Sequence, residues 1–206
     1  MHISWQIALA CTVGYLLGSL SFATLIAKKR GVDIFKVGSC NPGATNVKRV
    51  LGKKAGNTVF GMDFLKGFVA GLLPLLIAAD ENRELLAIVA ILAAIAGHSF
   101  SIFLRFRGGK GVATTMGGFL ALAPVVLLVG VGVWFVIFYT TRYVSLASII
   151  FGISLPVSSL LLHESSWVSG FCALIACLLI LRHKSNIGRL MNGTENRFSK
   201  KSDPKP

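Results

Sequence analysis

The chain has 206 residues, of which 54% are hydrophobic and 14% are charged, and its formal net charge is +13. Soluble domains carry about 25% charged residues, so the composition excludes an ordinary soluble protein and indicates a membrane protein. Of the 21 Lys and Arg residues, eight lie within 28–54, three within 105–110 and seven after Leu181; this clustering fits the positive-inside rule and contact with membrane lipids, and it argues against a nucleic-acid partner.

The first apolar segment runs from Ile3 to Ala27 without any Asp, Glu, Lys or Arg. About 20 such residues span a bilayer. Nothing basic precedes the segment, and its apolar run is too long for a signal peptide. We therefore expect a transmembrane helix, and its small residues Gly14 and Gly18 predict close helix packing.

A basic loop over Lys28–Asn57 follows, and it contains the run Gly38-Ser39-Cys40-Asn41-Pro42-Gly43-Ala44-Thr45-Asn46-Val47. We name this run the first glycine loop. Its small residues let backbone N–H groups turn toward one point, and Arg49 adds guanidinium donors. Such a concavity binds anions. The positive charge of the loop predicts that it is cytoplasmic and that the N-terminus is outside.

The second and third spans are expected from Asn57 to Ala79 and from Leu85 to about Phe103. Asp63 and Lys66 are three residues apart, on one helical face. A functional pair inside the membrane and an anchoring pair at its interface are both open. His98 is a base or, as is commoner, a hydrogen-bonded interfacial histidine.

The run Arg105-Phe106-Arg107-Gly108-Gly109-Lys110-Gly111 returns the chain to the basic face. We name it the second glycine loop, and it repeats the anion-binding pattern of glycines beside cations. We expect the two glycine loops at the same face of the membrane.

Residues 112–181 carry only Arg142, His163 and Glu164 as titratable charged groups. Pro124 predicts a break, so a short element over 112–123 precedes spans over 125–140, 144–162 and 167–181. An outside N-terminus and a basic, cytoplasmic C-terminus require an odd number of spans. The fold class is therefore an all-α, polytopic transmembrane bundle of about seven helices, or five if some segments are re-entrant.

Beyond the last span, His183, Asn186 and Leu190 share a helical face. We expect the helix to continue past the membrane and to turn His183 and Asn186 toward the loops. The polar end, 199–206, is expected to be a disordered cytoplasmic tail. Residues 1–198 are then a single transmembrane domain.

The sequence lacks the motifs of several enzyme classes: a Walker phosphate loop, a GxSxG nucleophile elbow and the His-x4-Asp motif of soluble-type glycerolipid acyltransferases. The cysteines form no CxxC pair, and we expect no metal or cofactor. Cationic and amide-bearing residues without a nucleophile suit a substrate that is already activated, such as a mixed carboxylic–phosphoric anhydride. Two anion sites would hold the leaving and the accepting phosphate and align the reacting groups.

Four motifs together resemble the PlsY family of bacterial inner-membrane acyl-phosphate:glycerol-3-phosphate acyltransferases. The motifs are the first glycine loop, Asp63-Phe64-Leu65-Lys66-Gly67, Gly97-His98 with Gly108-Gly109-Lys110-Gly111-Val112-Ala113-Thr114, and His183-x2-Asn186-x2-Arg189-Leu190. They occur in order along almost the whole chain.

The resemblance implies transfer of a fatty acyl group from acyl phosphate to the sn-1 hydroxyl of glycerol 3-phosphate, without an acyl-enzyme intermediate. The products are lysophosphatidic acid and phosphate, and an acyl-phosphate-producing phosphate acyltransferase supplies the donor. The implied site is at the cytoplasmic face of the inner membrane. Its catalytic residues are Ser39, Arg49, Lys110, His183 and Asn186, and its substrate-binding residues are Gly38, Asn41, Gly43, Ala44, Thr45, Asn46, Gly108, Gly109 and Gly111. Arg142 lies outside the family motifs and is expected to bind substrate because it belongs to the same set of cationic residues.

Two departures from the family pattern are Cys40, where glycine is usual, and Ser21, where proline is common. Cys40 is expected to tighten the first glycine loop if its φ is positive. The alternative function is a small multipass anion transporter with glycine-broken helices. A structural membrane protein leaves Asn41, Thr45, Asn46 and Asn186 without a role.

Overall fold

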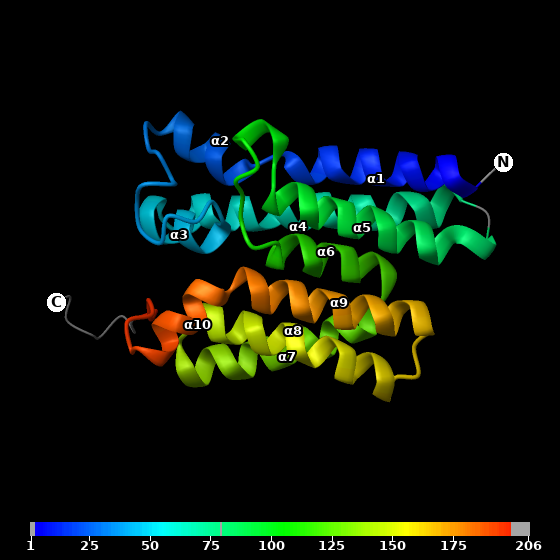
Figure 1. Cartoon of the computed structure of the whole chain (residues 1–206). Coiled ribbons are helices and arrows are strands. Elements are labelled where there is room, and N and C mark those ends of the chain that lie inside the picture. The colour runs from blue at the N-terminus through cyan, green and yellow to red at the C-terminus, as the bar shows by residue number, and fades with distance from the viewer. Residues whose placement is uncertain (1–2, 79, 199–206) are drawn as a thin grey trace. The chain divides into compact units, whose positions relative to one another are not determined.

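The computed structural model describes residues 3–78 and 80–198, and Figure 1 shows their arrangement. In this part of the chain all regular secondary structure is helical, apart from one isolated bridge between Ser101 and Arg107. The all-α class is therefore confirmed. The tail over 199–206 lies outside the described residues.

Contacts divide the chain into two compact units, Met1–Pro124 and Val125–Pro206. The single domain over 1–198 stays a prediction.

The first unit contains six α-helices in its described residues: α1 (Ile3–Ser19), α2 (Phe22–Lys29), α3 (Ala44–Leu51), α4 (Lys53–Ile77), α5 (Arg83–Ser99) and α6 (Val112–Leu122). In Figure 1, α1, α4 and α5 run alongside one another, with α2 and α3 at one end. Small residues allow this contact: a Cβ at Gly14 or Gly18 of α1 would overlap the backbone of Ala90 or Ala94 in α5. The predicted close packing is confirmed.

The first apolar segment is broken, contrary to the single helix predicted over Ile3–Ala27. The helix α1 ends at Ser19, and Ser21 caps α2 with extended backbone, its hydroxyl oxygen accepting from Thr24 N at 3.4 Å. A serine favours this arrangement because its side chain satisfies an N–H group that the helix start leaves unpaired.

The expected basic loop is also more helical than predicted, since it contains α3, and α4 begins at Lys53 instead of near Asn57. Gly52 separates the two helices with a φ of +88°, a conformation that glycine adopts without strain. Beneath the loop, an apolar cluster of Ala27, Ile34, Val47 and Val59 joins α2, α3 and α4. This cluster fixes the base on which the first glycine loop is built.

The second unit contains α7 (Pro124–Thr141), α8 (Val144–Leu161), α9 (Ser166–Arg182) and α10 (Lys184–Met191). The helix α7 opens with Pro124, so the predicted break there is confirmed. Phe151 and Leu155 of α8 and Ile175 and Leu179 of α9 are buried in the core.

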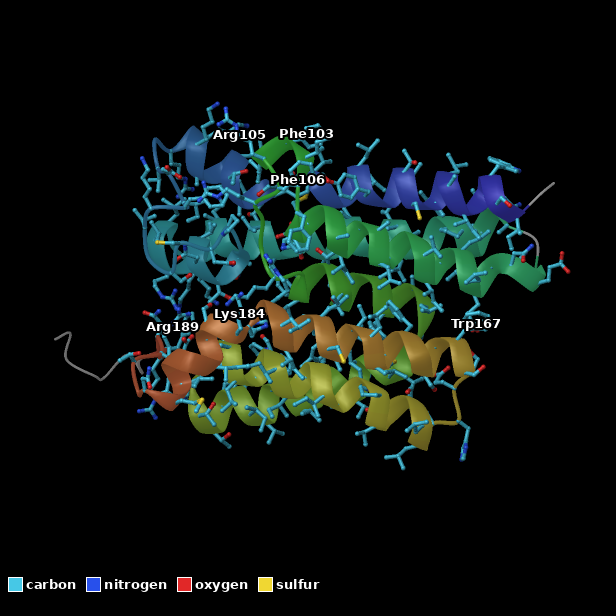
Figure 2. The ribbon with its side chains drawn as sticks, viewed as in Figure 1. Phe103, Arg105, Phe106, Trp167, Lys184 and Arg189 are labelled. Carbon is cyan, nitrogen blue, oxygen red and sulfur yellow. The ribbon has the colours of Figure 1, made fainter. Side chains whose placement is uncertain are left out.

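The chain stays helical past His183, as predicted, but it bends there, because α9 and α10 meet at 59°. The break is at His183, whose ring Nδ1 lies 2.8 Å from the carbonyl oxygen of Leu179. Figure 2 shows Trp167 at one end of α9, and Lys184 and Arg189 at the opposite end, on α10. An aromatic residue at one end and cations at the other are typical of a helix that spans a membrane.

Four described helical segments are long and apolar enough to cross a membrane: Ile3–Lys29, Lys53–Ile77, Pro124–Thr141 and Val144–Leu161. The bent pair of α9 and α10 makes a fifth if it is one span. The helices α5 and α6 have 17 and 11 residues, and 11 residues of helix reach only about 16 Å. The predicted apolar segments are thus all helical, while a count of seven crossings and the direction of the N-terminus stay predictions.

Candidate active site

Asn46 shapes the first glycine loop from within. Its side chain is buried, with 1% of the residue exposed. Its Oδ1 accepts from the backbone N–H of Ser39 at 2.9 Å, and its Nδ2 donates to the carbonyl oxygens of Val37 at 3.0 Å and Ile34 at 3.4 Å. The amide group therefore closes the loop over the start of α3 and aligns Ser39 with it.

Two residues of this loop have left-handed backbone, Gly38 with a φ of +60° and Cys40 with a φ of +55°. A Cβ at Gly38 would overlap Asn46 Oδ1, so a side chain there would displace the amide that closes the loop. Cys40 is exposed. Its positive φ meets the condition under which Cys40 was expected to tighten the loop, and a non-glycine residue adopts this conformation at a cost.

The loop ends at the N-terminus of α3, capped by Gly43. The first N–H groups of a helix have no acceptor within the helix and carry partial positive charge. Thr45 and Arg49 are four residues apart on α3, so they lie on one side of it. Backbone amides, a hydroxyl and a guanidinium are therefore presented along one short helix, and this set suits a phosphate.

The second glycine loop is folded tightly against the end of α5. The backbone N–H of Gly109 donates to the carbonyl oxygen of His98 at 3.1 Å. A Cβ at Gly108 would overlap that oxygen, and one at Gly109 would overlap His98 Nε2. Gly111 has a φ of +83° and caps α6. The loop needs these glycines, and they fix the position of Lys110 between them.

The structure brings the two glycine loops together. The carbonyl oxygen of Pro42 lies 3.1 Å from the point where Gly109 would carry a Cβ. Nearby, the guanidinium carbon of Arg107 lies 4.3 Å from the centroid of the Phe35 ring, a cation–π contact. The two glycine loops thus meet at Pro42 and Gly109 within the first unit.

The loop before α6 also carries exposed aromatic side chains. Figure 2 shows Phe103, Arg105 and Phe106 on this loop. Phe103 and Phe106 are each 63% exposed. Apolar rings beside a cation are typical of chain at a membrane–water interface.

In the second unit, His183 and Asn186 are both buried, with 3% and 4% exposed. A carbonyl oxygen only accepts, so the contact of His183 Nδ1 with Leu179 O places a ring proton on Nδ1. Asn186 lies one helical turn later, and its backbone N–H donates to His183 O at 2.8 Å.

Glu195, which the sequence analysis did not identify, holds Asn186 in place. Its Oε1 accepts from Asn186 Nδ2 at 2.8 Å and from the Ser145 hydroxyl at 2.9 Å, and its Oε2 accepts from Arg189 Nε at 2.8 Å. Burial by itself raises the pKa of Glu195, but these hydrogen bonds and the Arg189 charge outweigh it and hold the pKa below the ordinary 4.5. The only available sequence signal was that Glu195 is the sole acidic residue between Glu164 and Asp203.

Arg142 lies in the link between α7 and α8, with a φ of +66°. Its carbonyl oxygen accepts from Phe198 N at 3.0 Å, and its guanidinium carbon is 5.6 Å from the Tyr139 ring centroid. The predicted site residues are thus divided between the units: Arg142, His183 and Asn186 lie in the second, and the others lie in the first.

Comparison with known proteins places this arrangement in a family. Residues 8–193 match the family model described as glycerol-3-phosphate acyltransferase. Glycerol-3-phosphate acyltransferase of Fusobacterium nucleatum is 45% identical over 186 residues, or 89% of this chain and 94% of that protein. The enzyme of Aquifex aeolicus is 45% identical over 184 residues, or 89% of this chain and 95% of that protein.

Two crystal structures of PlsY, described as an integral membrane glycerol 3-phosphate acyltransferase, are similar in fold. The glycerol 3-phosphate form has a TM-score of 0.89 at 42% identity and covers 94% of this chain and 96% of its own. The lysophosphatidic acid form has a TM-score of 0.86 at 42% identity and covers 94% and 95%.

Proposed function

This chain belongs to the PlsY family of glycerol-3-phosphate acyltransferases, which are integral membrane enzymes, and we propose that its acyl donor is acyl phosphate. The enzyme then moves a fatty acyl group to the sn-1 hydroxyl of glycerol 3-phosphate. The products are lysophosphatidic acid and inorganic phosphate, and the reaction is the first acylation of phospholipid synthesis.

The observation that carries this proposal is the contact between the two glycine loops. Gly109 packs against Pro42, so two phosphate-binding surfaces adjoin. A donor that is itself a phosphate anhydride and an acceptor that is a phosphate ester supply one phosphoryl group for each surface. Holding both orients the acceptor hydroxyl toward the acyl carbon, and such alignment is a large part of catalysis for a two-substrate reaction.

In the proposed reaction the acceptor oxygen forms a bond to the acyl carbon, and the bond from that carbon to the donor phosphate oxygen breaks. The hydroxyl proton leaves with the phosphate, so no acyl-enzyme intermediate forms. Ser39, Arg49 and Lys110 bind the phosphates and stabilise the departing anion. His183 and Asn186 are the proposed catalytic residues of the second unit, and Arg142 is a substrate-binding residue.

The proposed location is the bacterial inner membrane, with the active site at the cytoplasmic face. Soluble glycerol 3-phosphate enters there, and the acyl chain stays in the lipid. A phosphate acyltransferase that makes acyl phosphate is the proposed functional partner. We propose that the reaction needs no cofactor.

Purified protein tests the proposal when it is given acyl phosphate and labelled glycerol 3-phosphate. We expect equal amounts of lysophosphatidic acid and phosphate, and no product when acyl-CoA or acylated acyl carrier protein replaces the donor. Turnover with acyl-CoA at a comparable rate would refute the donor assignment. Transport of phosphate into liposomes without acylation would favour the transporter instead.

The absence of an acyl-enzyme has its own test. Protein incubated with acyl phosphate and labelled inorganic phosphate, without glycerol 3-phosphate, should not exchange label into the donor. Exchange at a rate close to turnover would require a covalent intermediate.

A further inference from the structure

A buried ion pair lies under the second glycine loop. In α4, Lys66 Nζ lies 2.9 Å from Asp63 Oδ1, and the side chains of Asp63 and Lys66 are 3% and 4% exposed. Burying two charges is unfavourable unless further hydrogen bonds satisfy them. Of the two alternatives that the sequence left open, the structure therefore favours a pair built into the protein interior over one that anchors α4 at its surface.

Lys66 also stabilises the break in the first apolar segment. Its ammonium donates to the carbonyl oxygens of Gly18 at 2.9 Å and Leu20 at 2.8 Å. The break between α1 and α2 leaves these oxygens without partners within a helix. Two of the three ammonium protons are therefore committed to holding the kink.

The third proton faces the Asp63 carboxylate and the ring of His98, whose Nδ1 lies 3.0 Å from Lys66 Nζ. The same Nδ1 lies 3.6 Å from Asp63 Oδ1, so this edge of the ring contacts both members of the ion pair. The ion pair thus fixes the orientation of the His98 ring.

The opposite edge of the ring is packed against the second glycine loop. A Cβ at Gly109 would overlap Nε2, and Pro42 O lies beside the same point. The backbone N–H of Gly109 donates to His98 O at 3.1 Å. His98 therefore stands between the ion pair and the junction of the two glycine loops, and Lys110 is the next residue along.

We propose that His98 is a positioning residue for Lys110: held by the Asp63–Lys66 pair, its Nε2 edge fixes the second glycine loop in the conformation that binds phosphate. The inference rests on the proposed function for its effect on turnover. Its structural content, the dependence of the loop on the Nε2 edge, is independent of that function.

Two substitutions test the Nδ1 edge and the Nε2 edge of the ring one at a time. An Asn amide reaches about as far as Nδ1, so His98→Asn keeps a polar group beside the Asp63–Lys66 pair and removes the Nε2 edge. A Gln amide reaches about as far as Nε2, so His98→Gln keeps a polar group at the loop and removes the one beside the Asp63–Lys66 pair. We expect His98→Asn protein to keep its thermal stability and lose up to about 100-fold in turnover, the effect of a displacement of about 1 Å. We expect His98→Gln protein to be less stable and more active than His98→Asn protein.

Amide hydrogen exchange at Gly109 and Lys110 gives a readout that does not depend on activity. Exchange there should be faster in His98→Asn protein than in wild type, and close to wild type in His98→Gln protein. Ser158→Ala, which removes a buried hydroxyl bonded to Ser154 O, is the control and should change neither exchange at the loop nor turnover.

Three results would overturn the inference. The first is that the less stable of the two variants is also the less active. The second is unchanged hydrogen exchange of the loop in His98→Asn protein, and the third is failure of that protein to fold. If wild type forms no lysophosphatidic acid, the proposed function fails, while the exchange experiment still decides whether His98 positions the loop.

Discussion

Replacing Glu195 with glutamine tests how the second unit holds Asn186. The carboxylate accepts three hydrogen bonds, from Asn186, Ser145 and Arg189. Glutamine has one oxygen, so its NH2 group must face one of these donors. If the oxygen stays with Asn186 and Ser145, the NH2 group faces Arg189, and the charge-assisted bond at 2.8 Å is lost.

The expected loss follows from the partners. A hydrogen bond to a charged group contributes about 1.5–3 kcal/mol. The Arg189 side chain is 35% exposed, so water recovers part of this, and we expect a loss of about 2 kcal/mol. This corresponds to an increase of about 30-fold in the local opening of α10.

Hydrogen exchange of the α10 amides, residues 184–191, is the appropriate assay, because unfolding of membrane proteins is often irreversible. We expect about 30-fold faster exchange in α10 of Glu195→Gln protein, together with reduced acyl transfer. Glu164→Gln, the same chemical change in the link between α8 and α9, is the matched control. Unchanged exchange in α10 and full activity of Glu195→Gln protein would refute the role assigned to Glu195.

Acid should act on Glu195 as the substitution does. Because the pKa of this group is lowered in the folded protein from 4.5, its stabilisation is fully present above pH 4.5 and is lost as the pH falls through the lowered value. Exchange in α10, corrected for its intrinsic pH dependence, should therefore be constant above pH 5 and rise only in stronger acid.

Further substitutions test the glycine loops and the packing beneath them. Lys110→Ala and Arg49→Ala should each lower turnover by about 30- to 1,000-fold, which corresponds to about 2–4 kcal/mol for a lost phosphate partner; near-normal phosphate release by both proteins would remove these residues from the site. Cys40→Ala should keep most activity because no thiol chemistry is proposed, and loss of turnover in this protein would contradict that statement. Cys40→Gly should raise the free energy of unfolding by about 1 kcal/mol, because glycine adopts a positive φ without strain. Gly18→Ala should destabilise the first unit by about 1–3 kcal/mol through overlap with α5, whereas Gly61→Ala, which meets no atom within 4 Å, should not; equal melting temperatures would show that α1 and α5 do not need their close approach.

The sequence by itself determined the class of the protein and the identity of its unusual residues. Apolar runs free of charge can only be accommodated in lipid as helices, and Pro124 marked the start of α7. The first glycine loop was recognisable because its residue types have few other uses in a basic loop. These properties are local, and a local pattern is sufficient to read them.

Only the tertiary structure decided which groups meet. The break at Leu20 is stabilised by Lys66, a residue 46 positions away, and the bend of 59° at His183 is a feature that helical periodicity does not predict. Asn46 points inward to shape its own loop, and Glu195 joins α8 to α10 through contacts that no spacing rule contains. Each of these depends on partners distant in sequence, because a buried polar group is stable only where the fold supplies its hydrogen bonds.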